Sequence, residues 1–253
     1  MNGEAGARVL KLTLAYEGTA FAGWQRQPDA RTVQDALEQS LAIIEGRPVT
    51  LVAAGRTDAG VHARAQVASV AVRNRLPPRV LMKALNVRLP HDLRVTAIED
   101  VAPDFDARRH ARAKVYHYTM ALGDDPGPFV RRLVWHIPHP LDVPAMAAAA
   151  ALLTGEHDFA AFQATGSDVT TSVRRLLRSA LIADPGPPRY LHYQVTGTGF
   201  LRHMVRNIVG TLVEIGRRRW PPEEIQAILQ SRARHRAGAT APAQGLVLVR
   251  VHY

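Results

Sequence analysis

The sequence predicts an α/β protein of the α+β type, built from two tandem halves that each combine a mainly antiparallel sheet with helices on one face. Three observations lead to this prediction. Segments with apolar residues at every second position alternate with segments at helical spacing. The order β-α-β-β-α-β of the first half, which is the split βαβ pattern of ferredoxin-like and RRM-like domains, recurs in the second half. A chain of 253 residues can bury a core in each half.

The first half begins with a strand at about 9–16, where alternate leucines and a tyrosine share one face. A helix follows, because Thr32 and Asp35 make a start like a capping box and apolar residues recur at helical spacing until Gly46. The other elements expected here are a strand at about 49–56, a strand near 65–73, a helix from Pro77-Pro78 to about Leu85 and a strand near 93–99.

The second half opens on the strand "KVYHYTMAL", which places Tyr116, Tyr118 and Met120 on one face. Further expected elements are the alanine-rich helix "DVPAMAAAAALLTG", strands near 172–183 and 189–197, helices at about 200–216 and 222–231, and the final strand "GLVLVRVHY". Periodicity is lost near 100–112, so we predict domains 1–105 and 106–253. Two such halves leave open sheet surfaces that can meet along a cleft, where we expect the active site.

Charge and composition restrict the class of partner and the cellular compartment. Lys and Arg total 32 against 22 acidic residues, a formal net charge of +10 that favours a polyanionic partner, unless the arginine content only reflects codon usage. The chain has no cysteine, which excludes disulfides and thiolate metal sites. We find no signal-peptide core and no run of 18 apolar residues, so we expect a soluble, cytoplasmic protein.

The stretch "AAGRTDAGVHARAQV", residues 53–67, holds a single acidic residue, Asp58, between Arg56 and Arg64. A loop aspartate commonly caps a turn or pairs with a neighbouring arginine, and that simple interpretation stays open here. A model Asp titrates near ~3.9, and nearby guanidinium groups favour its charged form. An anionic carboxylate is suited to act as a nucleophile or a base, and poorly suited to act as a general acid.

Other kinds of chemistry lack their motifs. No second carboxylate or histidine at ligand spacing accompanies Asp58, as a hydrolytic metal site would require. The pair His136 and His139 in "WHIPHP" invites a zinc interpretation, but the prolines favour an extended loop and no further ligand is evident. Nucleophile elbow, P-loop and G-x-G-x-x-G are missing too, so we expect chemistry without a cofactor or metal.

Several blocks of the sequence resemble one family. "AGRTDAGVHA" is similar to the active-site signature of the TruA family of tRNA pseudouridine synthases. The further matching blocks, in order, are "YEGTAFAGWQRQ" (16–27), "TVQDALE" (32–38), "LNVRLPHD" (85–92), "FDAR" (105–108), "KVYHY" (114–118), "GEHDFAAF" (155–162), "FLRHMVRNIVGTL" (200–212) and "TAPAQGL" (240–246). Together they span nearly the whole chain.

The resemblance implies an isomerase that converts uridine to pseudouridine at positions 38, 39 and 40, in the anticodon stem-loop of tRNA, with one aspartate and no cofactor. Asp58 occupies the place of that aspartate. It would be the nucleophile, and whether it attacks ribose C1′ or uracil C6 stays open. Relatives are homodimers whose tRNA crosses both subunits, so a homodimer is implied as well.

Three more site residues follow from the resemblance. Tyr116 matches the tyrosine that contacts the target base, although periodicity alone favours a core aromatic at this position. Arg206 matches the arginine that pairs with the catalytic aspartate, and helical spacing would place it with Arg202 away from the apolar stripe, unless it is an ordinary surface arginine. Arg56 is expected to hold phosphate or to help extrude the base.

Other segments are weaker candidates. Gly23 to Gln27 and the basic run Arg108, Arg109, Arg112 and Lys114 are plausible RNA contacts, or simply solvated surface. His157 and Asp158 in "GEHDF" match a helix-end structural block, and we assign them no chemistry. Two competing hypotheses remain from other classes, a tRNA-binding chaperone without activity and a metal-dependent RNA-processing enzyme.

Overall fold

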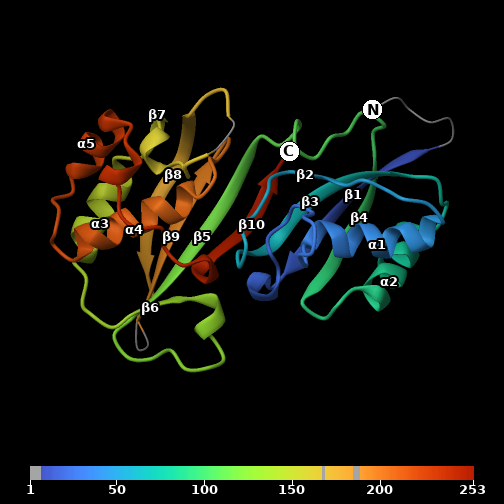
Figure 1. Ribbon diagram of the computed structural model, residues 1–253, viewed down its shortest axis with the longest axis horizontal. Coiled ribbons are helices and arrows are strands. Elements are labelled where there is room, and N and C mark those ends of the chain that lie inside the picture. The colour runs from blue at the N-terminus through green and yellow to red at the C-terminus, as the bar shows by residue number, and fades with distance from the viewer. Residues whose placement is uncertain (1–6, 167–168, 185–188) are drawn as a thin grey trace. The chain divides into compact units, whose positions relative to one another are not determined.

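The computed structural model describes residues 7–166, 169–184 and 189–253, and the chain divides into two compact units (Figure 1). The first unit comprises Met1–Arg112 and Leu248–Tyr253, and the second comprises Ala113–Val247. Each unit combines a mainly antiparallel sheet with helices. The predicted α/β class is therefore confirmed.

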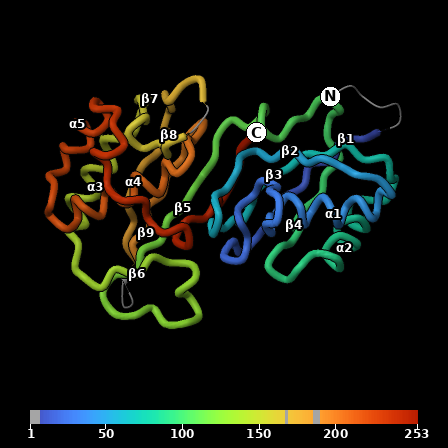
Figure 2. Tube along the Cα trace, in the orientation of Figure 1, coloured from blue at the N-terminus to red at the C-terminus, as the bar shows by residue number. Residues whose placement is uncertain are grey.

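The first unit has the strand order that a split βαβ pattern requires. Strand β1 (Arg8–Tyr16) lies between β3 (His62–Val72) and β4 (Leu93–Val101) and is antiparallel to both (Figure 2). The short β2 (Val52–Ala53) pairs with β3, also antiparallel. Numbered from one to four along the sequence, the strands of this unit thus lie in the order 4-1-3-2. The loop that connects β2 to β3 lies at one end of the sheet.

Two helices cover this sheet, α1 (Val33–Glu45) and α2 (Pro78–Arg88), and they lie side by side (Figure 1). Helix α1 begins where the Thr32 side chain accepts the Asp35 N–H at 3.3 Å, and it ends at Gly46, whose φ of 66° is left-handed. Its buried side chains include Val33, Leu37 and Leu41, and the leucines of β1 are fully buried as well. Each such side chain contributes roughly 1.5–3 kcal/mol of burial free energy.

The second unit contains the strand order β5-β9-β8-β7, with each neighbouring pair antiparallel. These strands are β5 (Ala113–Leu122), β7 (Gly155–Asp158), β8 (Val173–Ala183) and β9 (Arg189–Gly197), and β6 (Trp135–Ile137) pairs with β5 in parallel. Strands β5, β9 and β8 stand in the same 1-3-2 relation as the first three strands of the first unit.

Helices α3 (Val143–Ala151), α4 (Met204–Gly216) and α5 (Glu224–Ser231) belong to the second unit. Helix α3 packs on β8, where Ser179 Oγ donates to the Ala150 carbonyl at 2.7 Å, and α3 also contacts α4. Nearly every side chain of α4 is buried. Short 3-10 turns connect the elements: Gly18–Ala20, Arg131–Leu133, Ala160–Phe162, Arg234–Arg236 and Ala243–Gly245.

Two predictions of element boundaries need correction. The strand expected at 49–56 is only Val52–Ala53, because the Leu51 N–H donates to a Glu38 carboxylate oxygen at 2.9 Å instead of to a strand. The helix expected from 200 starts at Met204, because His203 has a left-handed φ of 61°. Arg202 consequently lies outside the helix.

The segments "WHIPHP" and "GEHDF" also differ from expectation. The first was expected to be an extended loop, and its residues Trp135–Ile137 form β6. The second was expected at a helix end, and Gly155–Asp158 form β7. Strand β6 has only three residues and β7 has only four. Alternation of apolar residues cannot be detected over so few positions.

The division of the chain differs from the predicted boundary between residues 105 and 106. The segment after Asp106 is tied to the first unit, because the Ala107 N–H donates to Ser69 Oγ at 3.1 Å and the Tyr253 hydroxyl donates to the Ala107 carbonyl at 2.9 Å. The last strand, β10 (Leu246–His252), begins in the second unit and lies mostly in the first, beside β3.

Candidate active site

The aspartate singled out by the sequence lies on the loop between β2 and β3. Asp58 is half-buried and Arg56 is exposed. The loop closes on itself where the Val61 N–H donates to the Asp58 carbonyl at 3.1 Å, and Gly60 adopts a positive φ of 77°. This turn presents both side chains from one short segment, which we call the Asp58 loop (residues 54–61).

A second segment braces the backbone of the Asp58 loop. The Trp24 N–H donates to the Thr57 carbonyl at 3.0 Å, and the Gly60 N–H donates to the Phe21 carbonyl at 3.2 Å. Gly23 has a φ of 93°, and a Cβ there would lie 2.7 Å from the Thr57 carbonyl oxygen. Only glycine combines this conformation with so close an approach. The backbone is therefore held both before Asp58, at Thr57, and after it, at Gly60.

Buried polar side chains also hold the Asp58 loop. The Tyr16 hydroxyl and Thr57 Oγ1 share a hydrogen bond of 2.8 Å, and Gln66 Nε2 donates to the Gly55 carbonyl at 2.8 Å. Burial raises the pKa of Tyr16 to about 12, and the hydrogen bonds to Thr57 and Gln66 offset part of that rise. Tyr16 stays neutral at ordinary pH, so it positions the loop without adding charge beside Asp58.

Two residues near the loop have structural roles. His62 is 3% exposed, and its Nδ1 accepts the Gly18 N–H at 2.9 Å, so its ring helps to hold the segment beside the loop. Trp24 is 3% exposed. The expectation that the whole segment Gly23 to Gln27 contacts RNA is wrong for its first two residues, because Gly23 and Trp24 are buried while Gln25, Arg26 and Gln27 are exposed.

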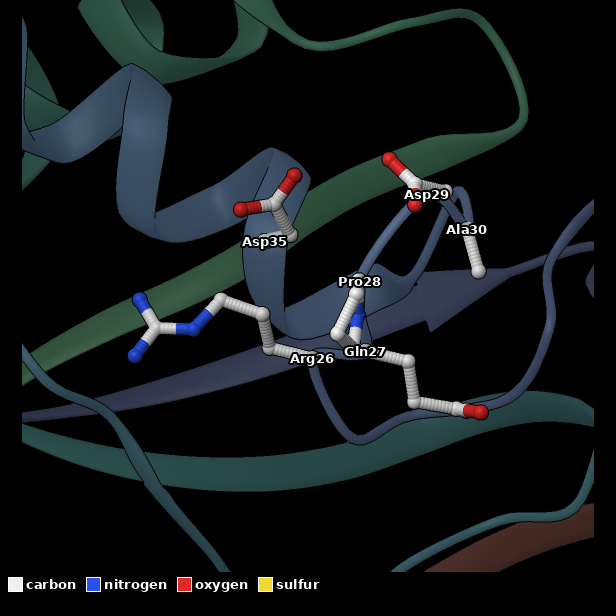
Figure 3. A pocket seen from close by; sticks show the side chains of 6 residues that line it. All are labelled: Arg26, Gln27, Pro28, Asp29, Ala30 and Asp35. Carbon is white, nitrogen blue, oxygen red and sulfur yellow. The ribbon is translucent and has the colours of Figure 1, made fainter.

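A shallow hollow of about 460 Å³ opens beside the first turn of α1 (Figure 3). Its lining consists of Arg26, Gln27, Pro28, Asp29, Ala30 and Asp35. Arg26 also donates to the buried Glu38 carboxylate at 3.1 Å. Arginine and two carboxylates in one open hollow give it a mixed charge, and the Asp58 loop is not part of its lining.

In the second unit, Tyr116 lies on β5 and is 7% exposed. Its ring packs edge-to-face against Phe200, with centroids 5.0 Å apart. An aromatic pair of this geometry is worth roughly 0.5–1.5 kcal/mol beyond the buried area. Packing against Phe200 thus fixes the orientation of the Tyr116 ring. A fixed ring is compatible both with a core aromatic residue and with a residue that contacts the target base.

Arg206 lies on α4 and is half-buried. Its Nε donates to the Ala241 carbonyl at 2.8 Å, and the Ala241 N–H donates to the Arg206 carbonyl at 3.1 Å. Burial raises the pKa of Tyr118, and the Arg206 guanidinium partly opposes that rise, which places this positive charge near the Tyr118 ring. The bond at Nε sets the plane of the guanidinium.

The four predicted site residues are therefore divided between the two units, two in each. Asp58 and Arg56 share one loop of the first unit, and Tyr116 and Arg206 belong to the second unit. Sequence reasoning missed the groups that support these residues, above all Tyr16, which alternation assigned only to the core. The block "YEGTAFAGWQRQ" carried the signal, since it contains the tyrosine and the glycines that hold the Asp58 loop.

The remaining candidates fall into surface and structural groups. Arg108, Arg109 and Arg112 are exposed, so the basic run remains available to a polyanion. Asp158 accepts the Ala160 N–H at 3.0 Å and pairs with Arg232 at 2.8 Å, which is a structural use of that carboxylate. A hydrogen bond from Ser172 is the largest cause that holds the pKa of Asp158 below its usual range.

The zinc interpretation of "WHIPHP" gains no support, because His136 Nε2 shares a hydrogen bond of 2.7 Å with the Gly123 carbonyl. Within residues 7–166, 169–184 and 189–253, no three His, Asp or Glu side chains gather as metal ligands would. In the same part of the chain, none of the helices has the length and apolar character needed to cross a bilayer.

Comparison with known proteins identifies the family. The family model described as tRNA pseudouridine synthase matches residues 13–108 and 149–253. The chain belongs to this family. Asp58, Arg56 and Arg206 lie inside the matched ranges, and Tyr116 lies between them. The family recognised from the sequence blocks is confirmed, and membership makes the protein an isomerase that acts on tRNA.

Individual relatives cover almost the entire chain. A tRNA pseudouridine synthase A of Moorella thermoacetica is 51% identical over 246 residues, which are 96% of this chain and 99% of the relative. Proteins of the same name from Myxococcus xanthus and Geobacter are 45% and 44% identical, and they match 96% and 97% of this chain and 91% and 99% of their own length.

Proposed function

We propose that this pseudouridine synthase isomerises uridine at positions 38, 39 and 40 of the tRNA anticodon stem-loop, with Asp58 as the nucleophile. The observation that carries the proposal is the setting of Asp58. It is the single carboxylate of an otherwise basic loop, and neutral groups and backbone contacts hold that loop in place. A fixed, half-buried carboxylate can attack a base or sugar without first reorganising.

The reaction balances without an external reactant. The Asp58 carboxylate attacks ribose C1′ or uracil C6, and the bond between N1 and C1′ breaks. The freed uracil turns, a bond forms between C5 and C1′, and the hydrogen on C5 is released while N1 gains one. No electron leaves the system, so the proposal includes no redox cofactor. If C1′ was attacked, the bond between the Asp58 oxygen and C1′ breaks as C5 bonds to C1′, and if C6 was attacked, the bond to C6 breaks by elimination after the base has rejoined the ribose. Either cleavage regenerates the carboxylate.

Three other side chains have roles in the proposal. The proposal assigns Arg206 to pair with the Asp58 carboxylate and to orient it for attack. Tyr116 contacts the extruded base, for which a rigidly packed aromatic ring is suited. Arg56 is exposed beside Asp58, where a guanidinium can bind phosphate in bidentate fashion. The proposal also includes a cytoplasmic location and a homodimer. Static light scattering, which measures the molar mass in solution, would test the homodimer.

Release of tritium from C5-labelled uracil in tRNA measures the reaction directly. We expect Asp58→Asn to lose roughly 10³-fold or more in rate, because the amide is no nucleophile. Asp104→Asn, at an exposed position of the same unit, is the matched control and should keep the wild-type rate. Full activity of Asp58→Asn would remove it as nucleophile. Transcripts with cytidine at 38, 39 or 40, one at a time, test the position.

The same assay separates the two competing hypotheses. A tRNA-binding chaperone would bind tRNA with wild-type affinity and release no tritium. A metal-dependent enzyme would lose activity in EDTA, whereas the proposed reaction should proceed at an unchanged rate. Trapping an adduct on tRNA that contains 5-fluorouracil would show whether C1′ or C6 carries the bond to Asp58.

A further inference from the structure

We propose that Arg234 is a positioning residue for the reaction, because it fastens the segment 237–242 to helix α4 and so fixes the orientation of the Arg206 guanidinium. This inference deepens the proposed function, since it rests on the assignment of Arg206 to the reaction. Arg234 lies in a 3-10 turn well separated from Arg206 in sequence, and none of the sequence blocks that resemble the family contains it.

The guanidinium of Arg234 bridges two parts of the second unit. Its NH1 donates to the carbonyls of Ala237 and Gly238 at 3.3 and 3.0 Å. Its NH2 donates to Asn207 Oδ1 at 3.0 Å and to Thr240 Oγ1 at 3.1 Å. One planar fork thus joins the segment 237–240 to the residue that directly follows Arg206 on α4.

Asn207 is the point on α4 where these bonds converge. It is fully buried, and its Oδ1 accepts both from Arg234 and from Thr240 Oγ1, the latter at 2.6 Å. Its Nδ2 donates to the Phe162 carbonyl at 2.8 Å. Both lone pairs of Oδ1 are used, so removal of Arg234 or of the Thr240 hydroxyl would leave a buried acceptor partly unsatisfied.

The segment transmits its position to Arg206 through the next two residues. Ala241 follows Thr240, and its carbonyl accepts the bond from Arg206 Nε while its N–H donates to the Arg206 carbonyl. Pro242 follows, and its carbonyl accepts the Tyr118 hydroxyl at 2.8 Å. A displacement of the segment therefore moves the acceptor that sets the plane of the Arg206 guanidinium.

The backbone of this segment touches α4 directly. A Cβ on Gly238 would lie 2.7 Å from Thr211 N, and the Gly238 N–H donates to Thr211 Oγ1 at 2.9 Å. The segment can therefore move only away from the helix, and the bonds from Arg234 and Thr240 oppose that movement.

The simpler interpretation of Arg234 is a contact to RNA, given the positive charge of the chain. Its two terminal nitrogens already make four hydrogen bonds within the protein, and the residue is half-buried. Its neighbours Arg232 and Arg236 are exposed. Phosphate would meet these neighbours first, so the internal role accounts better for Arg234.

Arg234→Lys keeps the charge and loses the fork, and Thr240→Val keeps the shape and loses the hydroxyl. Arg236→Lys is the matched control, because Arg236 shares the 3-10 turn and pairs only at the surface with Glu224 at 2.8 Å. The first readout is the Nε–H resonance of Arg206 in nitrogen-15 spectra of the full-length protein, assigned by its loss in Arg206→Lys.

We expect this Nε–H to exchange slowly with water in the wild type and in Arg236→Lys, and at least about tenfold faster in both test variants. An unchanged resonance in Arg234→Lys and Thr240→Val would overturn the inference, whatever happens to activity. Thr240→Val alone is decisive if Arg234→Lys does not fold.

The second readout compares the change in kcat with the change in the Kd for tRNA. Misplacement of a catalytic group by about 1 Å can lower the rate 10²-fold, so we expect kcat to fall at least about tenfold while the Kd for tRNA changes less than about twofold. A faster Nε–H exchange with unchanged kcat would instead remove Arg206 from the reaction, and so would overturn the proposed role on which the inference rests. Equal losses in kcat and in affinity would assign Arg234 to RNA binding.

Discussion

The Asp58 loop and the segment 237–242, which we call the Arg206 anchor, are held by different kinds of interaction. Backbone hydrogen bonds, the close approaches of Gly18 to Val61 and of Gly23 to Thr57, and neutral hydroxyl groups hold the Asp58 loop. A charged guanidinium and a buried amide, Arg234 and Asn207, hold the segment against which Arg206 is fixed. The contacts that brace the backbone of the Asp58 loop thus come from neutral groups, whereas the Arg206 guanidinium depends on a second guanidinium.

The difference shows how each region can be broken. The Asp58 loop depends on the space between two backbone segments, so an added methyl group should disturb it more than the loss of a polar group. The Arg206 anchor depends both on close approach and on satisfied polar atoms, so it is sensitive to either change.

The largest effect is expected for Gly210→Ala in helix α4. A Cβ there would lie 1.7 Å from the Ala239 carbonyl oxygen, which is backbone and cannot rotate away. We expect a loss of at least about 3 kcal/mol in the free energy of unfolding, at the upper end for overpacking, measured by urea denaturation. Alanine is the better helix former by about 1 kcal/mol, so a stabilised variant would show that the close approach is wrong.

The matched control is Gly216→Ala at the end of the same helix. Its Cβ would meet the Met146 sulfur at 2.5 Å and Leu141 Cβ at 3.2 Å. The end of a methionine side chain can move aside, so the loss should be clearly smaller than for Gly210→Ala. Equal losses would mean that the helix tolerates no added methyl group anywhere, and the contrast between backbone and side-chain obstacles would fail.

The next effect is expected for Gly23→Ala, which presses on the Asp58 loop. The φ of 93° and the Thr57 carbonyl 2.7 Å from the added Cβ should together cost roughly 1–3 kcal/mol in stability. Displacement of Asp58 should lower kcat by about 10- to 100-fold in the tritium assay. Gly46→Ala has a similar φ of 66° with nothing within 4 Å of its Cβ, so it should lose stability and keep its rate. A parallel loss of rate in both variants would contradict the brace.

A smaller effect is expected for Tyr16→Phe, which removes the hydroxyl bonded to Thr57. The buried Thr57 hydroxyl would lose its partner, at a cost of roughly 1–3 kcal/mol in stability, with a modest fall in kcat. Tyr253→Phe removes a hydroxyl bonded to the Ala107 carbonyl in the same unit. That variant should lose similar stability and no activity, and a fall in its rate would show that the two hydroxyls are not functionally distinct.

The smallest effect concerns alkaline pH. Because burial raises the pKa of Tyr16 from 10.0 to about 12, the unfolded chain loses this proton first as the pH rises. The stability that Tyr16 provides is complete below pH 10 and falls through the window between pH 10 and 12. From pH 9 to 11 the loss should be about 1.4 kcal/mol, and Tyr16→Phe should lack this part of it. Identical pH curves for the two proteins would contradict the shift.

Local signals in the sequence were sufficient for the long elements. Thr32 and Gly46 predicted both ends of α1, and alternation predicted β1 and β9 closely. The start of α4 could not be predicted, because His203 adopts a left-handed conformation that no local preference of histidine indicates. The short β2 was overestimated because a distant side chain, Glu38, takes the hydrogen bond of Leu51.

The candidate site divides in the same way. Asp58 was recognised because it is the one acid in a basic loop, and the family signature then implied the others. The supporting groups escaped because their partners are far apart in sequence: Tyr16 bonds Thr57, and Arg234 bonds Asn207. Such pairings are properties of the folded chain, and composition and periodicity carry no information about them.

The return of the last strand to the first unit has a consequence for synthesis on the ribosome. Strand β10 lies beside β3, yet residues 248–253 are translated only after the whole second unit. Until then one edge of β3 lacks its final neighbour, and an open strand edge is a site for mispairing. The first unit can begin to fold as it emerges, and it becomes complete only when residues 248–253 have been added.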